Sequence, residues 1–217
     1  MKTILISGYE HFGGDTFNPS LALAMALNGR TYRDYEFKYV KIPVSRARAV
    51  SQMTEAIDIL KPEIVICTGL AYERAGISVE RVAINVADFP FPDMDGYLSL
   101  NEAIDPDGPA AYFSTLPIRR IQEAVRKEGI PIFVSNSAGT YCCNMLMYGT
   151  LNYIKKNNLN IKAGMMHVPY TPDMVTGKDF KMPSMSLDCM VRAVYTAAVT
   201  AVDFKDDDNS VICGFAQ

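Results

Sequence analysis

The chain has 217 residues, of which 49% are hydrophobic and 21% charged. This composition is typical of a soluble globular protein and excludes disorder as a description of the whole chain. The formal net charge of −3 does not favour nucleic acid or an anionic membrane as a partner, because both are bound by basic surfaces. The first apolar stretch is too short for a signal peptide or a membrane span, so we expect a cytoplasmic protein.

The cysteine pattern does not favour a disulfide framework or a zinc site. The count is odd, two cysteines are adjacent, and no Cys-x-x-Cys occurs. The cysteines are Cys67, Cys142, Cys143, Cys189 and Cys213. Since His11 and His167 are the only histidines, any mechanism that needs a histidine must use one of these two.

Short β-branched runs alternate with amphipathic stretches along the chain, a pattern that predicts strands alternating with helices. The elements expected, in chain order, are a strand at 2–7, a helix opening near Pro19, a strand at 35–43, a helix at 46–60, strands at 64–69 and 77–85, a loop at 87–97, a helix at 117–128, a strand at 130–136, a helix at 141–156, a strand at 161–168 and a helix at 186–203. The tail from Lys205 is expected to be a solvated turn or a frayed end. We therefore predict one α/β domain over residues 1–217, with a mainly parallel sheet covered on both faces.

Ligands of open parallel sheets bind beyond the carboxyl ends of the strands. The segments that follow the apolar strands are therefore the places to look for chemistry. These segments are 8–14, 69–74, 136–143 and 167–172.

The segment SNSAGTYCCN lies between an apolar strand and a long helix. With Thr140 as the predicted N-cap, Cys142 and Cys143 fall in the first helical turn. The unpaired N–H groups and positive dipole end there favour a thiolate nucleophile, and the same N–H groups could hold an oxyanion. The alternative is that both cysteines are small core residues.

His167 ends the last apolar strand and is expected at the same sheet edge as the cysteines. A thiol nucleophile needs a base, and histidine is the usual one; the alternative is a histidine satisfied by the backbone. Glu80 lies in an apolar context, where a carboxylate needs a partner. It either forms a salt bridge with Arg74 or Arg81, or orients the histidine as the third member of a triad.

Other candidates carry weaker signals. His11 lies in a glycine-rich loop, which favours a surface or pocket-rim role. That loop, GYEHFGG, matches neither a dinucleotide-binding nor a Walker phosphate motif. Asp93 and Asp95 are possible acids, but aspartates beside proline and glycine usually form turns.

Seven colinear segments together resemble the pyroglutamyl peptidase I family, also called pyrrolidone-carboxylate peptidases, which are cysteine peptidases that remove N-terminal pyroglutamate. The resemblance runs from about residue 4 to about residue 200. The segments are 8–20 (GYEHFGGDTFNPS), 80–85 (ERVAIN), 92–93 (PD), 108–120 (GPAAYFSTLPIRR), 138–144 (AGTYCCN), 167–170 (HVPY) and 183–188 (PSMSLD).

The resemblance implies a role for each triad candidate. Cys143, directly before Asn144, matches the family nucleophile, whereas Cys142 stands where an apolar residue is usual. His167 matches the base and Glu80 the acidic member. The family also implies an α/β/α sandwich, no cofactor, a cytoplasmic enzyme that is frequently a homotetramer, and peptides with N-terminal pyroglutamate as substrates.

Pyroglutamate is a neutral lactam, so an apolar, aromatic pocket with a few hydrogen bonds suits it. By resemblance, Tyr9, Phe12 and Tyr141 lie at aromatic pocket positions and Phe91 at an apolar one. Asn18 matches a position that organises the same loop. Core packing is the alternative for each aromatic residue.

Three departures from the family pattern alter the walls around the triad. Tyr72 and Glu73 replace a glycine pair before Arg74. Pro90 replaces an arginine thought to lie near the reacting group, so oxyanion stabilisation or the leaving-group side could differ. His11 replaces a usual proline.

These departures leave two rival hypotheses open. One is a related cysteine hydrolase of another amide or lactam. The other is a protein that binds a small ligand on a hydrolase scaffold without catalysis, since a fold alone does not specify function. A third, weaker hypothesis is a nucleoside-processing transferase of similar architecture, but the sequence contains no phosphate motif that supports it.

Overall fold

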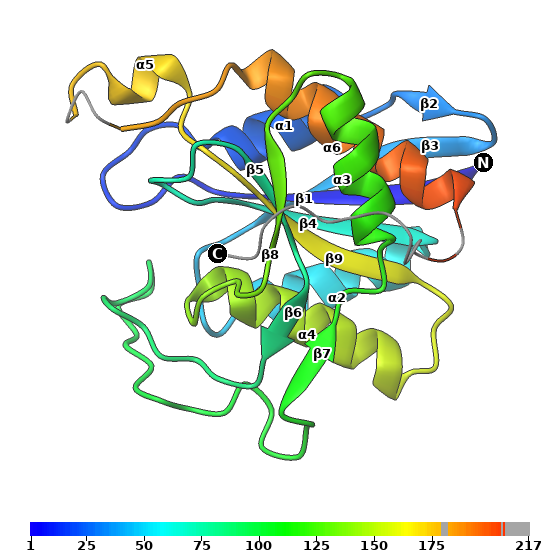
Figure 1. Ribbon diagram of the computed structural model, residues 1–217. Helices are drawn as coiled ribbons and strands as arrows, with labels where there is room; N and C mark the ends of the chain where they lie inside the picture. The colour runs from blue at the N-terminus through cyan, green and yellow to red at the C-terminus, as the bar shows by residue number, and fades with distance from the viewer. Residues whose placement is uncertain (179–181, 205, 207–217) are drawn as a thin grey trace.

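The computed structural model describes residues 1–178, 182–204 and 206, so most of the tail predicted from Lys205 lies outside the described residues (Figure 1). A central sheet of seven strands runs through the molecule in the order β2-β3-β1-β4-β9-β5-β8. Its strands are β1 (Lys2–Tyr9), β2 (Thr31–Tyr32), β3 (Tyr35–Ile42), β4 (Ile64–Leu70), β5 (Ile77–Glu80), β8 (Ile132–Ser135) and β9 (Lys162–Val168). Two further strands, β6 (Val82–Ile84) and β7 (Ala111–Phe113), pair antiparallel as a separate small sheet.

The main sheet is mostly parallel. β1 is parallel to β3 and β4, and β4 is parallel to β9. β5 is antiparallel to β9, and β8 is parallel to β5. The expectation that segment 136–143 follows a strand at the same carboxyl edge as β1, β4 and β9 is therefore wrong. Instead, β8 ends level with Glu80, and the segment from 136 to 141 leads on to the helix that carries the cysteines.

Helices cover both faces of the sheet, as Figure 1 shows with α1, α3 and α6 on one side and α2 and α4 on the other. Alternate residues of β1 point to the two sides. Ile4 and Ile6 belong to the core under α1 and α6, whereas Leu5 belongs to the core under α2 and α4. The helices are α1 (Pro19–Leu27), α2 (Ala49–Leu60), α3 (Ile118–Lys127), α4 (Cys142–Lys156), α5 (Pro172–Val175) and α6 (Leu187–Asp203). The predicted α/β sandwich with a mainly parallel sheet is confirmed.

One predicted element is divided in the structure. The single strand expected at 77–85 breaks at Arg81, and the two halves join different sheets as β5 and β6. The Arg81 side chain turns outward and donates to Asn136 Oδ1 at 2.7 Å. The short elements β2, β7 and α5 were not predicted, because two to four residues are too few for a periodic pattern to emerge.

Candidate active site

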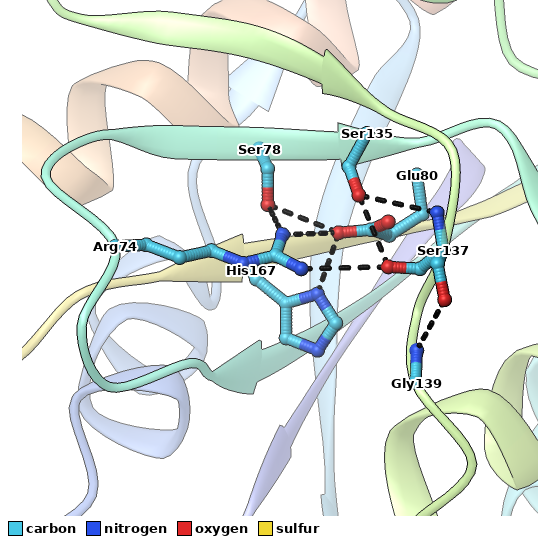
Figure 2. Close-up of polar contacts among 7 residues, drawn as sticks. All are labelled: Arg74, Ser78, Glu80, Ser135, Ser137, Gly139 and His167. Atoms are coloured by element: carbon cyan, nitrogen blue, oxygen red, sulfur yellow. Dashed lines mark hydrogen bonds and ion pairs between the residues drawn. The ribbon is translucent and has the colours of Figure 1, made fainter. Parts of the chain in front are cut away.

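His167 lies on β9 between two neighbouring strands, opposite Gly69 of β4 and Ser78 of β5. Its side chain is buried, and its Nδ1 atom lies 2.8 Å from Glu80 Oε1 (Figure 2). The backbone-satisfied alternative for His167 is therefore not what is found. With Nδ1 engaged by the carboxylate, Nε2 is the ring nitrogen left to exchange a proton with another group.

Glu80 is fully buried at the end of β5, and three groups converge on its Oε1 atom. Besides His167, Arg74 Nη1 donates to it at 2.6 Å and Ser78 Oγ at 3.0 Å, as Figure 2 shows. The guanidinium of Arg74 also donates to Ser78 and packs over the Phe133 ring. The two interpretations of Glu80 drawn from its sequence context thus hold together: it pairs with Arg74 and it contacts the histidine.

The charges of this group support one another. Burial alone would raise the pKa of Glu80, but the hydrogen bond and charge of His167, with the charge of Arg74, lower it to about 2. Burial alone would lower the pKa of His167, but Cys143 and Glu80 raise it to about 9. Glu80 is thus held as a carboxylate and His167 as an imidazolium at neutral pH, which is the charge state that stabilises a neighbouring thiolate.

Cys143 lies in the first turn of α4, as predicted, although the cap differs. Tyr141 is the N-cap and provides no side-chain hydrogen bond to the helix. The predicted cap, Thr140, instead donates from Oγ1 to Asp88 O at 2.6 Å. The first N–H groups of a helix have no acceptor within it, so those at the start of α4 remain available to a bound oxygen atom.

Asn144 anchors this helix start to the β6 segment. Its side-chain amide donates to Ile84 O and Val86 O, both at 2.9 Å, and its Oδ1 accepts from Ile84 N at 2.9 Å. Sequence reasoning used Asn144 only as a marker for the preceding cysteine. Its position after the cysteine pair, at a buried helical site, could have indicated that its side chain forms hydrogen bonds within the fold.

The two adjacent cysteines differ in environment. Cys142 also lines the cavity but is 1% exposed and packs within the core under α2 and α4, where burial raises the pKa of its thiol. Cys143 is half-buried and lines a cavity that also contains the His167 side chain. Of the two, Cys143 has the access and the neighbouring base that a nucleophile needs.

Gly69 allows Cys143 and His167 to approach each other. A Cβ atom at this position would lie 2.8 Å from Cys143 Sγ and 3.3 Å from His167 Cδ2. Both side chains therefore pack directly against the bare backbone of β4. This role of Gly69 was not predicted, because Gly69 is far in sequence from both partners.

The cavity has a volume of about 390 Å³, within the range of small-molecule sites. Its walls are mainly apolar and aromatic, with few polar groups. The lining residues that the sequence analysis did not single out are Val44, Leu70, Ala71, Ala138 and Gly139. The residues that depart from the family pattern, Tyr72, Glu73 and Pro90, also line the cavity.

All five predicted pocket residues line this same cavity, with Cys143 and His167; they are Tyr9, Phe12, Asn18, Phe91 and Tyr141. The Phe91 and Tyr141 rings contact each other, with centroids 5.0 Å apart. Tyr9 is buried, and its hydroxyl donates to Cys142 O at 2.7 Å, which ties the end of β1 to α4.

Asn18 has its side-chain atoms engaged within the protein. Its amide donates to Glu10 O at 2.9 Å, and its Oδ1 accepts from Ser20 N at 3.0 Å and from Ser20 Oγ at 2.8 Å. It thereby caps α1 and shapes the loop after β1. Asn18 therefore contributes to the cavity by fixing the conformation of the loop after β1.

The weaker candidates lie elsewhere. His11 is exposed and does not line the cavity. Asp93 accepts from the N–H groups of Arg46, Asp95 and Tyr97, and Asp95 pairs with Arg48, so both aspartates hold turns. Within the part of the chain that the structure describes, no group of three or more His, Cys, Asp or Glu residues could hold a metal ion, and no helix is long and apolar enough to cross a membrane.

The chain is similar to known proteins over nearly its whole length. The pyroglutamyl peptidase family model matches residues 2–204. The pyrrolidone-carboxylate peptidase of Thermococcus litoralis is 41% identical over 216 residues, which is 98% of each chain, and that of Bacillus subtilis is 41% identical over 96% of each.

Solved structures extend the similarity to the fold. The pyrrolidone carboxyl peptidase of T. litoralis superposes with a TM-score of 0.94 at 40% identity, over 98% of this chain and 100% of that one. The pyroglutamyl peptidase I of Bacillus amyloliquefaciens gives a TM-score of 0.93 at 39% identity, over 96% and 99%. The chain therefore belongs to the pyroglutamyl peptidase family of cysteine peptidases.

Proposed function

We propose that this enzyme is an exopeptidase that hydrolyses the N-terminal L-pyroglutamyl group from peptides, with Cys143, His167 and Glu80 as its triad. The observation that carries the proposal is the 2.8 Å contact of His167 Nδ1 with buried Glu80, on a ring whose other side meets Cys143 in an aromatic cavity. Family membership and the names of the relatives support the same substrate class.

In the first half of the reaction, Cys143 Sγ attacks the carbonyl carbon of the pyroglutamyl residue. His167 takes the thiol proton, or already holds it as an imidazolium beside a thiolate. The carbonyl electron pair moves onto oxygen, where the N–H groups at the start of α4 can stabilise it. As the intermediate collapses, the C–N bond breaks and His167 Nε2 donates its proton to the leaving amine. A thioester to Cys143 and the shortened peptide result.

In the second half, His167 takes a proton from water, and the resulting hydroxide attacks the thioester carbon. The C–S bond breaks, pyroglutamate leaves, and the proton returns to the Cys143–His167 pair. Throughout, Glu80 keeps Nδ1 protonated and Nε2 facing the sulfur, the role a triad carboxylate has in general.

The cavity suits the acyl group of this substrate. A pyroglutamyl ring carries no charge, and the Tyr9, Phe12, Phe91 and Tyr141 side chains provide an apolar enclosure for it. A free, charged amino terminus would lose its hydration among these four side chains, which offer no carboxylate to pair with it. Cytoplasmic location, homotetramer assembly and a single domain over residues 1–217 stay predictions.

The test is hydrolysis of a fluorogenic pyroglutamyl amide under reducing conditions by wild type, Cys143→Ala and the matched control Cys142→Ala. We expect Cys143→Ala to lower kcat by about four to six orders of magnitude, and Cys142→Ala to retain most activity. The reverse ranking would move the nucleophile by one residue.

The outcome in wild type separates the rival functions. A folded wild-type protein that ignores pyroglutamyl amides but cleaves another amide would contradict the proposed substrate. A protein inactive on every amide, whose Cys143 is also inert to iodoacetamide at neutral pH, would instead be a ligand-binding protein.

A further inference from the structure

Glu73 is an acidic residue in the wall of the candidate cavity. It lies in the short segment between β4 and β5, is exposed to solvent, and lines the cavity together with Tyr72 and Arg74. Its backbone has φ of +70°, in the left-handed region that glycine adopts without strain and other residues disfavour. A glutamate is thus held at a position where local conformation alone would select glycine.

The other charges at the cavity offset one another when Cys143 is the thiolate of the proposed mechanism, because Arg74 and His167 are then positive and Glu80 and Cys143 negative. Arg74 donates to Glu80, and His167 contacts the same carboxylate. Glu73 has no ion pair with any residue that the structure describes. Since the charges of these other groups sum to zero, Glu73 gives the wall its one charge without an ion pair among the described residues.

The position of this segment relates it to the leaving group. Arg74, the next residue, bonds to the carboxylate that holds His167, so segment 72–74 lies on the histidine side of the cavity. The leaving amine receives its proton from His167 and must therefore lie on that side. The Phe91 and Tyr141 rings that would enclose the pyroglutamyl group come from other segments of the chain.

We propose that Glu73 selects substrates by the charge of the residue that follows pyroglutamate, favouring lysine or arginine and disfavouring glutamate or aspartate. The inference rests on the proposed function, whose leaving-group side it specifies. Tyr72, 54% exposed beside it, offers a ring face for the aliphatic stem or the cation of the same side chain.

The test compares pyroglutamyl peptides that are identical except for lysine, alanine or glutamate at the second position, with kcat/KM measured from released pyroglutamate. A single carboxylate at a solvated cavity mouth is expected to give wild type about a tenfold preference for the lysyl over the glutamyl peptide. Raising the salt to about 1 M, where the screening length is about 3 Å, should remove most of that preference.

Two variants separate charge from structure. Glu73→Gln keeps the shape of the side chain, and we expect it to lower kcat/KM for the lysyl peptide and raise it for the glutamyl peptide, with a ratio within about twofold of one. Glu73→Lys should reverse the preference. The matched control is Glu55→Gln, which removes the same charge from an exposed site on α2 outside the cavity and should keep the wild-type ratio.

The outcomes distinguish a failure of the Glu73 proposal from a failure of the proposed function. A lysyl-to-glutamyl ratio unchanged in Glu73→Gln, with the alanyl peptide hydrolysed by wild type, would overturn the role of Glu73 alone. A fall in both rates by the same factor would assign Glu73 a structural role and overturn it as well. Wild type that hydrolyses none of the three peptides would overturn the proposed function and this inference with it.

Discussion

Gly69→Ala should disable catalysis while leaving the fold intact. The new methyl carbon would lie 2.8 Å from Cys143 Sγ, about 1 Å inside the contact distance of about 3.5–4.0 Å. Sulfur is at the end of a short side chain that can rotate about χ1, so the clash is relieved by moving Sγ away from His167. A displacement of about 1 Å at the reacting atoms lowers the rate about 10²-fold, which is about 3 kcal/mol in the barrier.

The thermal stability of Gly69→Ala should change little, in contrast to its activity. Alanine is favoured over glycine within a strand by roughly 0.5–1 kcal/mol, which offsets much of the packing disturbance. We therefore expect a change in melting temperature within about 4 °C, measured by thermal unfolding, beside the loss in kcat/KM on a pyroglutamyl amide. Gly177→Ala is the matched control, because a Cβ there meets no atom of the described residues within 4 Å.

The pattern of the two measurements decides the interpretation. Full activity in Gly69→Ala would mean that the close approach of Cys143 and His167 is not needed for the reaction. A large fall in melting temperature together with lost activity would make Gly69 a packing residue of the strand. Only low activity in a stable protein matches the geometry of the site.

Two further predictions concern the buried carboxylate. Glu80→Gln should lower kcat/KM by about 10²–10⁴-fold. Because Glu80 helps raise the pKa of His167 to about 9, the alkaline fall in activity should also move to lower pH. An unchanged pH profile would remove Glu80 from the triad. Arg74→Met should shift acid unfolding. Although burial raises the pKa of Glu80, the charges around it lower that pKa from 4.5 to about 2, so its ionised form stabilises the fold above about pH 4.5 and that contribution is lost as the pH falls towards 2. Without the Arg74 charge the loss should begin at higher pH by circular dichroism, whereas Arg81→Met, which removes a cation bound to Asn136 instead, should leave the acid midpoint in place.

The site has an uneven distribution of rigid and adaptable parts. Glu80 and His167 lie on strands of the central sheet, and Asn144 ties α4 to β6. These residues have little freedom to move, as the proton transfer proposed for Glu80 and His167 requires. The Tyr72–Arg74 segment and Phe91 lie on loops, where variation is tolerated without disturbing the sheet. Differences in substrate preference among members of such a fold are therefore expected in these loops.

Periodicity in the sequence was enough to predict most of the architecture. The continuous apolar runs of β4 and β9 are typical of strands buried on both faces, and the breaks at Pro62 and Gly129 mark where α2 and α3 must stop. These signals act over a few residues, so they are readable without a structure. Three of the four strand-end segments selected for chemistry contribute to the cavity in the way expected.

The strand directions and contact partners depended on long-range packing. β5 and β8 are antiparallel to β9. No local pattern specifies this, because a short apolar strand has the same sequence pattern in parallel and antiparallel pairing. Arg74 and Arg81 are equally near Glu80 in the chain, yet only Arg74 contacts it, since Arg81 begins the turn into the second sheet.

The same reason separates the residues that could be found early from those that could not. Cys143, His167 and Glu80 carry chemistry in their side chains, so their types and settings marked them along the chain. The roles proposed for Gly69 and Glu73 depend on what lies near them in space. A Cβ added at Gly69 would lie 2.8 Å from a sulfur atom, and Glu73 lies in a cavity wall beside Arg74. Such roles belong to the assembled sheet, because folding alone brings positions 69, 143 and 167 within contact of one another.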